Sequence, residues 1–311
     1  MKAMVHRTYG SLEQAELPVP VPKDDEVLIR VKAAGVDPGV SYRMTGVPYL
    51  MRLFGFGLTR PKQPIAGGDV AGVVEKVGAK VTRLKAGDEV FGAAVGGFAE
   101  YVVAKENLLV LKPANLTFEQ AAAVPTSALT ALRGAKEAGT GKKALVIGAA
   151  GGIGTFLVQL HEGEVTAVCS GGKADLVREL GATHVVDYTK EDLGTGTYDV
   201  VYDVYGSRDV NVLRRRLTPR GQLIILGGMS KGKVTGLGRQ FRALGLNLFV
   251  KQQLKVLIAL PTLADYEDLR ERLAAGTLVP YVDRTYPLAE AKQAIDHVMA
   301  GHAKGKSVIT L

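Results

Sequence analysis

Cysteine is nearly absent from this chain of 311 residues, in which Cys169 is the only one. A single cysteine excludes an intramolecular disulfide and any zinc site built from several cysteines. Long apolar segments are missing too, since no uninterrupted run approaches the ~18 residues of a membrane-spanning helix. Residues 1–7 lack the apolar core of a signal peptide. These absences predict a cytoplasmic protein with no membrane partner.

Acidic residues are too few to balance the basic ones, because 39 Lys and Arg face 31 Asp and Glu and leave a formal net charge of +8. Such a charge suits nucleic acid, a membrane surface or an anionic cofactor. The one dense basic cluster, residues 214–216, lies in a helical pattern typical of a solvated helix face. No basic groove with interleaved aromatic residues and no helix-turn-helix pattern is present. We therefore expect no nucleic-acid partner, and a small molecule as the ligand.

What the chain does contain is enough apolar sequence, 47% of its residues, to build two domains. Residues 1–116 hold short apolar runs between glycine turns, and the pattern predicts strands at 26–32, 70–77, 89–92 and 99–104. Short strands at this spacing are typical of a compact β-rich barrel. The first domain is thus predicted over residues 1–116.

The pattern changes at Thr117, which Gln120 follows at the spacing of a helix-capping box. Beyond it strands and helices alternate, and this alternation predicts an α/β domain with a doubly wound parallel sheet over residues 117–260. The expected strands are 144–148, 165–169, 184–188, 199–204 and 222–227, and the expected helices are 126–138, 152–162, 173–180 and 208–217. Residues 261–311 are predicted to form helices at 264–275 and 288–300 and a last strand at 306–311.

The most informative segment is an apolar run at 144–147 that breaks into a glycine-rich turn at 148–154. The run predicts a buried parallel strand, and the following helix N-terminus carries partial positive charge that favours a pyrophosphate. The dinucleotide fingerprint G-x-G-x-x-G falls on Ala149, Gly151 and Gly154, with alanine in place of the first glycine. A glycine turn without a ligand is the alternative. The expected cofactor contacts are Gly148, Ala149, Ala150, Gly151, Gly152 and Ile153.

The second strand of this domain ends without a carboxylate, and this feature bears on which dinucleotide is bound. An Asp or Glu at that place would bind the ribose 2′-hydroxyl of NAD and repel a 2′-phosphate. The chain has Ser170, two glycines and Lys173 there, a set that suits a phosphate. Tyr188, after the third strand, could add a phenolic hydrogen bond. A surface lysine at a helix start is the alternative for Lys173, and the prediction is NADPH.

Several motifs together resemble one family, the zinc-independent, quinone oxidoreductase-like branch of the medium-chain dehydrogenases/reductases. They lie at residues 33–38, 68–75, 77–78, 87–92, 97–101, 122–125, 148–154, 187–189 and 301–306. The resemblance implies a GroES-like β-rich catalytic domain and a Rossmann domain, with residues 261–311 returning to the first. It implies hydride transfer from NADPH to quinones or to the β-carbon of activated alkenes. It also implies a homodimer that pairs through an edge strand of the Rossmann domain, expected at 246–250.

The residues at the zinc-ligand positions of related dehydrogenases bear on whether this chain binds a metal. Zinc-dependent relatives place a Cys near position 36 and a Gly-His-Glu near 67–69, whereas this chain has Val36 and Asp37, and then Gly67, Gly68 and Asp69. The sequence therefore predicts no bound metal. Without a Lewis acid, an alkoxide loses its usual stabilisation. Reduction of a quinone or a conjugated alkene is favoured, because its charge spreads over a conjugated system.

Two candidate catalytic residues follow from the resemblance. Tyr42 matches a tyrosine of the active-site cleft in quinone reductases and could hydrogen-bond a substrate carbonyl or relay a proton. A packing residue at the mouth of the site is the alternative. Asp37 stands where relatives usually carry Asn, and its carboxyl group could donate a hydrogen bond if burial raised its pKa. The alternative for Asp37 is a turn residue before Pro38.

Other residues are expected near the nicotinamide end. Thr130 matches a residue beside the nicotinamide and its ribose, or else is a helix hydroxyl bonded to its own backbone. The strand end at Gly227, Gly228 and Met229 is predicted to approach the carboxamide, with an ordinary turn as the alternative. His161, at a helix end, is interpreted as structural.

The apolar segment 49–60 could form a mobile lid or a surface-packed helix. Tyr49 and Phe54 of this segment, with Phe249 and Val250, are candidate walls of the substrate pocket, with core packing as the alternative for the last two. A non-catalytic NADPH-binding sensor and an enoyl reductase acting on acyl chains remain competing hypotheses for the whole chain.

Overall fold

The computed structural model describes residues 1–228 and 236–311, apart from the side chain of Phe54. The chain divides into two compact units, Met1–Leu129 together with Leu260–Leu311, and Thr130–Ala259. Residues 117–129 thus group with the first unit, whereas the sequence predicted them as the start of the second domain. The physical reason is that helix α2 (Phe118–Ala122) packs on strands β3 (Glu26–Val36) and β4 (Asp69–Val77) of the first unit.

The first unit is built on a seven-stranded sheet with the order β14-β15-β3-β4-β5-β7, in which β6 also pairs with β3. Strand β3 is antiparallel to β4, β6 and β15. Its alternate residues Val27, Ile29 and Val31 are buried in one core, as the two-residue period of a strand predicts. The remaining strands are β5 (Glu89–Ala93), β6 (Tyr101–Lys105), β7 (Leu109–Leu111), β14 (Val282–Pro287) and β15 (Lys306–Thr310), with a small sheet of β1 (Lys2–Val5) and β2 (Glu13–Glu16).

Three helices of this unit, α1 (Pro38–Thr45), α2 and α8 (Leu263–Ala274), begin at residues whose side chains cap them. The predicted capping box is confirmed, since the Gln120 backbone N–H donates to Thr117 Oγ1 at 3.2 Å and Gln120 Oε1 accepts from the Thr117 N–H at 3.0 Å. The other elements are the π-helix η1 (Arg52–Phe56), η2 (Glu106–Leu108), η4 (Leu288–Glu290) and α9 (Ala291–Met299).

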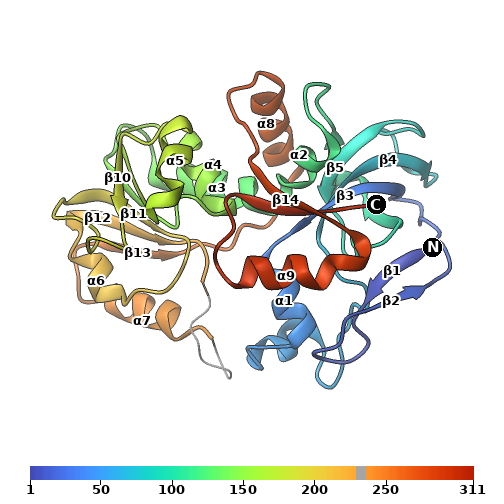
Figure 1. Cartoon of the computed structure of the whole chain (residues 1–311), viewed down its shortest axis with the longest axis horizontal. Helices are drawn as coiled ribbons and strands as arrows, with labels where there is room; N and C mark the ends of the chain where they lie inside the picture. The colour runs from blue at the N-terminus through green and yellow to red at the C-terminus, as the bar shows by residue number, and fades with distance from the viewer. Residues whose placement is uncertain (229–235) are drawn as a thin grey trace. The chain divides into compact units, whose positions relative to one another are not determined.

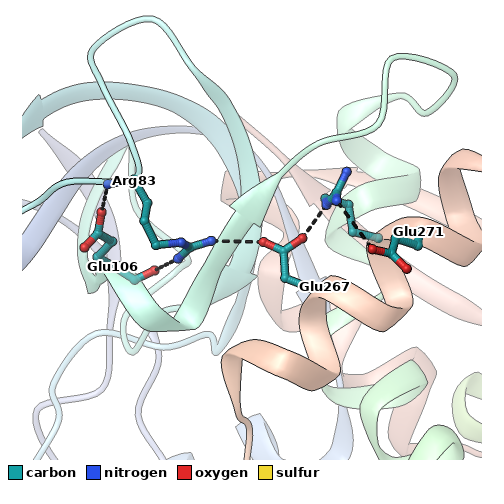
Figure 2. A network of polar contacts seen from close by, with 5 residues as sticks. Arg83, Glu106, Glu267 and Glu271 are labelled. Atoms are coloured by element: carbon teal, nitrogen blue, oxygen red, sulfur yellow. Dashed lines mark hydrogen bonds and ion pairs between the residues drawn. The ribbon is translucent and has the colours of Figure 1, made fainter.

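The C-terminal segment contacts the β-rich region through a polar network. Figure 2 shows the Arg83 guanidinium between the Glu106 carbonyl, at 3.4 Å, and the Glu267 carboxylate of α8, at 3.0 Å. These side chains are about one-third exposed, so the ion pair contributes little to the free energy of unfolding by itself. Its role is to orient α8 against η2.

The second unit is a six-stranded parallel sheet with the order β10-β9-β8-β11-β12-β13. Figure 1 labels β10, β11, β12 and β13 of this sheet. The strand order reverses between β8 and β11, as in a doubly wound Rossmann sheet, where ligands bind at the carboxyl ends of these two strands. The strands are β8 (Ala144–Ile147), β9 (Val165–Cys169), β10 (His184–Asp187), β11 (Tyr198–Asp203), β12 (Leu217–Ile225) and β13 (Gln253–Val256). The helices are α4 (Gly152–Leu160), η3 (Gly171–Lys173), α5 (Ala174–Glu179), α6 (Val210–Arg214) and α7 (Gly238–Leu246), and α3 (Pro125–Ala138) begins in the first unit and continues into the second.

Two expectations for this unit are wrong. The edge strand is β13, whereas the predicted edge strand at 246–250 begins on the last residue of α7. Leu254 of β13 is buried and pairs with Leu223 of β12. The strand that pairs with β12 therefore lies after residues 246–250 in the chain. The helix predicted at 208–217 ends at Arg214, because Leu217 pairs with Tyr198 as the first residue of β12. Within the described ranges, no helix is long and apolar enough to cross a membrane.

Candidate functional site

The glycine-rich turn lies where β8 meets α4, at the reversal of strand order. Gly148 has φ +83°, a left-handed conformation that glycine adopts without strain, and the Gly151 N–H closes the turn on the Gly148 carbonyl at 3.1 Å. Ala149 is buried and does not have a positive φ, which explains why alanine is accepted at the first fingerprint position. The tight turn is thus made one residue earlier than the fingerprint predicts.

The third fingerprint position admits only glycine. A Cβ on Gly154 would lie 2.1 Å from the Gly148 carbonyl oxygen and 2.6 Å from the Ala149 Cα, so the helix could not pack on the turn. Gly151 is the N-cap of α4, and no side chain of the described residues caps this helix. The first-turn N–H groups, which include those of Gly152 and Ile153, are therefore available to an anion such as a pyrophosphate.

A buried ion pair borders the same edge of the sheet. Asp203, the last residue of β11, pairs in register with Ile147 of β8 and is fully buried. Its Oδ1 accepts from the Gly206 N–H at 3.0 Å, and its other oxygen contacts the guanidinium of Arg239 in α7. Neither residue was predicted from the sequence. The only sign of this ion pair in the sequence is an aspartate at the end of a predicted strand, because its partner Arg239 belongs to a distant helix.

The glycines after β12 are explained by local packing. A Cβ on Gly227 would lie 2.6 Å from the Val204 carbonyl oxygen, and one on Gly228 would lie 2.3 Å from the Gly206 Cα. Gln240 of α7 also donates to the Gly228 carbonyl at 3.2 Å. The loops after β11 and β12 are thus packed against each other. Met229 lies outside the described residues, so the predicted contact of this loop with a carboxamide stays a prediction.

The residues predicted for the 2′-phosphate come from neighbouring strand ends. Ser170 and Lys173 flank the short helix η3 after β9, and the Lys173 N–H donates to the Ser170 carbonyl at 2.9 Å. Tyr188 follows β10, where its N–H donates to the Cys169 carbonyl at 3.2 Å, and its side chain is 52% exposed. The structure therefore places these three residues on two adjacent loops of one sheet edge.

In the first unit, Asp37 and Tyr42 lie on one element. Asp37 is the N-cap of α1, where its Oδ1 accepts from the Gly39 N–H at 2.7 Å, and Pro38 is the first helical residue. This is the turn role that the sequence left open for Asp37. Tyr42 follows on the same helix and is partly buried. Its catalytic role stays a prediction.

A buried carboxylate, named above only because its segment lacks the zinc-ligand motif, also lies in this unit. Asp69 is fully buried, accepts from the Thr126 hydroxyl at 2.6 Å, and has the Lys306 ammonium at 3.6 Å. Burial raises the pKa of Asp69 above its ordinary value. The charge of Lys306 and the hydrogen bonds from Thr126 act in the opposite direction, whereas the charge of Asp37 adds to the increase. Its oxygens are thus engaged by its own unit. The described part of the chain contains no group of three or more His, Cys, Asp or Glu side chains placed to hold a metal.

The segment that begins at Tyr49 is held by one arginine. Arg52 lies over the Tyr9 ring at 4.0 Å and the Tyr49 ring at 4.8 Å, and its Nε donates to the Gly46 carbonyl at 2.9 Å. Tyr49 is 46% exposed, while the side chain of Phe54 lies outside the described residues. Neither the lid nor the pocket role is tested by these contacts.

The other two predicted pocket residues, Phe249 and Val250, differ in exposure. Phe249 is 84% exposed, whereas Val250 packs against the core of the second unit.

His161, interpreted as structural from the sequence, is buried: its Nδ1 lies 3.0 Å from the Tyr202 hydroxyl and its Nε2 lies 2.8 Å from the Lys142 carbonyl. A carbonyl only accepts, so Nε2 donates there and Nδ1 accepts from Tyr202.

Comparison with known proteins supports the same architecture. Residues 23–114 match the model of the alcohol dehydrogenase GroES-like domain, and residues 180–309 match the model described as zinc-binding dehydrogenase. The 2-methylene-furan-3-one reductase of Solanum lycopersicum is 34% identical over 335 residues, which cover 99% of this chain and 79% of that protein. The chain belongs to the medium-chain dehydrogenase/reductase family.

Other members of the medium-chain dehydrogenase/reductase family place the chain in the quinone oxidoreductase-like branch. The NADPH-dependent alkenal/one oxidoreductase of Arabidopsis thaliana, a chloroplastic protein, is also 34% identical, over 99% of this chain and 79% of its own length. The structure of Escherichia coli quinone oxidoreductase complexed with NADPH superposes with a TM-score of 0.83 at 25% identity, with both chains covered completely. The predicted family and the GroES-like plus Rossmann fold are confirmed.

Proposed function

We propose that this chain is an NADPH-dependent, zinc-independent oxidoreductase that transfers hydride to a quinone or to the β-carbon of an enone or enal. The observation that carries the proposal is the N-terminus of α4, which no side chain of residues 1–228 and 236–311 caps, joined to a turn in which Gly154 leaves no room for a side chain. Relatives named as NADPH-dependent alkenal/one oxidoreductase and quinone oxidoreductase support the choice of cofactor and acceptor.

The second unit would bind the cofactor, which supplies a hydride from its nicotinamide ring. The α4 N-terminus and the turn from Gly148 to Ile153 bind the pyrophosphate through backbone N–H groups. Lys173 and the hydroxyl groups of Ser170 and Tyr188 bind the 2′-phosphate. Thr130 and the backbone of the Gly227–Gly228 loop orient the nicotinamide.

The first unit would act on the acceptor. The Tyr42 hydroxyl donates a hydrogen bond to the acceptor carbonyl and stabilises the negative charge that develops there. Asp37 fixes the first turn of the helix that carries Tyr42, through its hydrogen bond to Gly39. Tyr49 is proposed to line the acceptor pocket. An apolar wall excludes water from the reacting carbon.

The proposal is tested by NADPH consumption with four acceptors: a quinone, an enal, a cyclic enone and the saturated aldehyde that matches the enal in chain length. We expect oxidation of NADPH with the conjugated acceptors and none with the saturated aldehyde. A chelator is expected to have no effect, and inhibition by it would overturn zinc independence. A protein that binds NADPH and reduces none of the acceptors would be a sensor.

We also propose a cytoplasmic location and a homodimer that pairs through the outer edge of β13, where no further strand of the described chain lies. Exposed apolar residues flank this strand on both sides, since Phe249 is 84% and Ile258 81% exposed. A second copy pairing at β13 would cover both the edge and these side chains.

A further inference from the structure

The loops that follow β9 and β10 meet through one aspartate. Asp187 is the last residue of β10 and lies opposite Cys169, the last residue of β9, in the parallel register. Beyond this pair the two chains form the loops that hold Ser170 and Lys173 on one side and Tyr188 on the other. The side chain of Asp187 is only 17% exposed, although it lies at the edge of the sheet.

The carboxylate of Asp187 is directed to the backbone of both loops. Its Oδ1 accepts from the Thr189 N–H at 3.0 Å and from the Thr189 hydroxyl at 2.7 Å. Hydrogen bonds from Thr189, and then one from the Gly171 N–H, lower the pKa of Asp187. The carboxylate is therefore ionised at neutral pH and connects the turn after β10 to the loop after β9.

The two glycines between Ser170 and Lys173 differ in the space around the position that a Cβ would occupy. A Cβ on Gly171 would lie 2.4 Å from Asp187 Oδ2, whereas a Cβ on Gly172 would have no atom within 4 Å. The sequence attributed both glycines to room for a phosphate. The structure shows that Gly171 makes room for the Asp187 carboxylate, since a Cβ at this position would require that carboxylate to move.

We propose that Asp187 is a positioning residue that sets the preference for NADPH over NADH, because it holds the loop with Ser170 and Lys173 beside Tyr188. This inference rests on the proposed function, since it concerns the 2′-phosphate site of the same cofactor. A carboxylate near this site would by its charge alone repel the 2′-phosphate. The positioning effect and the charge effect therefore predict changes of opposite sign when Asp187 is replaced.

The direct test measures binding of adenosine 2′,5′-bisphosphate and of 5′-AMP by calorimetry, in the wild type and in Asp187→Ala. We expect the variant to lose about tenfold in affinity for the bisphosphate, because it lacks hydrogen bonds to a charged acceptor. Affinity for 5′-AMP is expected to stay within about twofold, because this probe makes no contact with the 2′-phosphate site. The ratio of kcat/KM for NADPH to that for NADH should fall by the same factor.

Three further variants separate the explanations. Gly171→Ala breaks the contact from the other side and should shift the ratio in the same direction. Asp187→Asn removes the charge but keeps one acceptor, so its loss should be smaller. Asp175→Asn removes an exposed charge two residues beyond Lys173 and should leave the ratio unchanged, because this carboxylate pairs only with Arg178 at 2.9 Å among the contacts of the described chain.

The outcomes that overturn the inference are distinct from failure of the proposed function. Tighter binding of the bisphosphate by both Asp187 variants would show charge repulsion and exclude positioning. An equal loss of both probes in Asp187→Ala and Gly171→Ala would show general damage to the fold and also overturn it. Failure of the wild type to bind the bisphosphate would instead refute the NADPH site itself.

Discussion

At the scale of single residues, the structure separates glycines required by the fold from those that a ligand could use. Gly154 must be glycine because backbone atoms of the preceding turn occupy the place of a side chain. Gly245 of α7 has open space around its missing Cβ. Replacement by alanine is therefore expected to have opposite effects on the free energy of unfolding at these two helical glycines of the same unit.

Gly154→Ala is expected to lower the free energy of unfolding by about 1–3 kcal/mol, because backbone must move to admit the methyl group. NADPH binding should weaken as well, since the turn and the α4 N-terminus move together. Gly245→Ala is the control and should raise the free energy of unfolding by about 0.5–1 kcal/mol. Denaturant unfolding and NADPH titration measure both effects. Equal stability of the two variants would contradict the packing argument.

Tyr42→Phe tests the proposed hydrogen bond to the acceptor. We expect kcat with an enone to fall by roughly tenfold or more, while the KM for NADPH stays unchanged, because the hydroxyl acts on the acceptor only. Tyr281→Phe, a partly exposed tyrosine of the same unit, serves as the control. Unaltered kcat in the Tyr42 variant would leave Tyr42 as a packing residue.

At the scale of elements, helix α4 shows how a tertiary contact ends a helix. The sequence predicts this helix to 162, but it ends at Leu160 with His161 as its C-cap. The imidazole of His161 bonds to Tyr202 of β11 and to the Lys142 carbonyl, and these bonds fix the chain direction before β9. The N-terminus of α4, where the pyrophosphate is proposed to bind, lies at the other end of the helix.

His161 gives this element a pH dependence. Burial lowers the pKa of His161, so the folded protein holds it neutral at a pH where the unfolded chain, with a pKa near 6.5, takes up a proton. The stabilisation is complete above about pH 6.5 and is lost as the pH falls below that value. His161→Gln should be less stable at pH 7 and should show a smaller further loss between pH 7 and pH 5. Thermal unfolding at both pH values measures the difference, and parallel losses in the two proteins would refute the assignment to His161.

At the scale of the whole molecule, the chain forms two units from three stretches of sequence, because Leu260–Leu311 joins Met1–Leu129. Strand β15 explains this return, since it lies between β14 and β3 in the first sheet and places Val308 and Ile309 in the core. The buried Lys306 beside Asp69 belongs to the same strand.

The proposed dimer is tested at this scale by light scattering after size-exclusion chromatography. We expect two copies for the wild type and one for the double variant Phe249→Asp and Ile258→Asp. Both side chains are exposed, so the variant is expected to stay folded. A monomeric wild type would exclude the proposal.

The sequence by itself determined the class of fold and the place of the nucleotide turn. Apolar runs such as 144–147 and local signals such as the Thr117 capping box act over a few residues, so they can be found without knowing what packs against them. The start and end of most strands in the second unit follow from the same local pattern. The residue types at Ser170, Lys173 and Tyr188 are visible in the same way, although their binding roles are still predictions.

Only the tertiary structure decided how distant residues meet. Asp203 with Arg239, Asp69 with Lys306, and Asp187 with Gly171 come together because the packing of the whole unit brings residues of separate elements into contact. It also placed the sheet edge at β13 instead of 246–250, since pairing with β12 selects the strand. Burial and pairing depend on every element at once, and no local pattern encodes them.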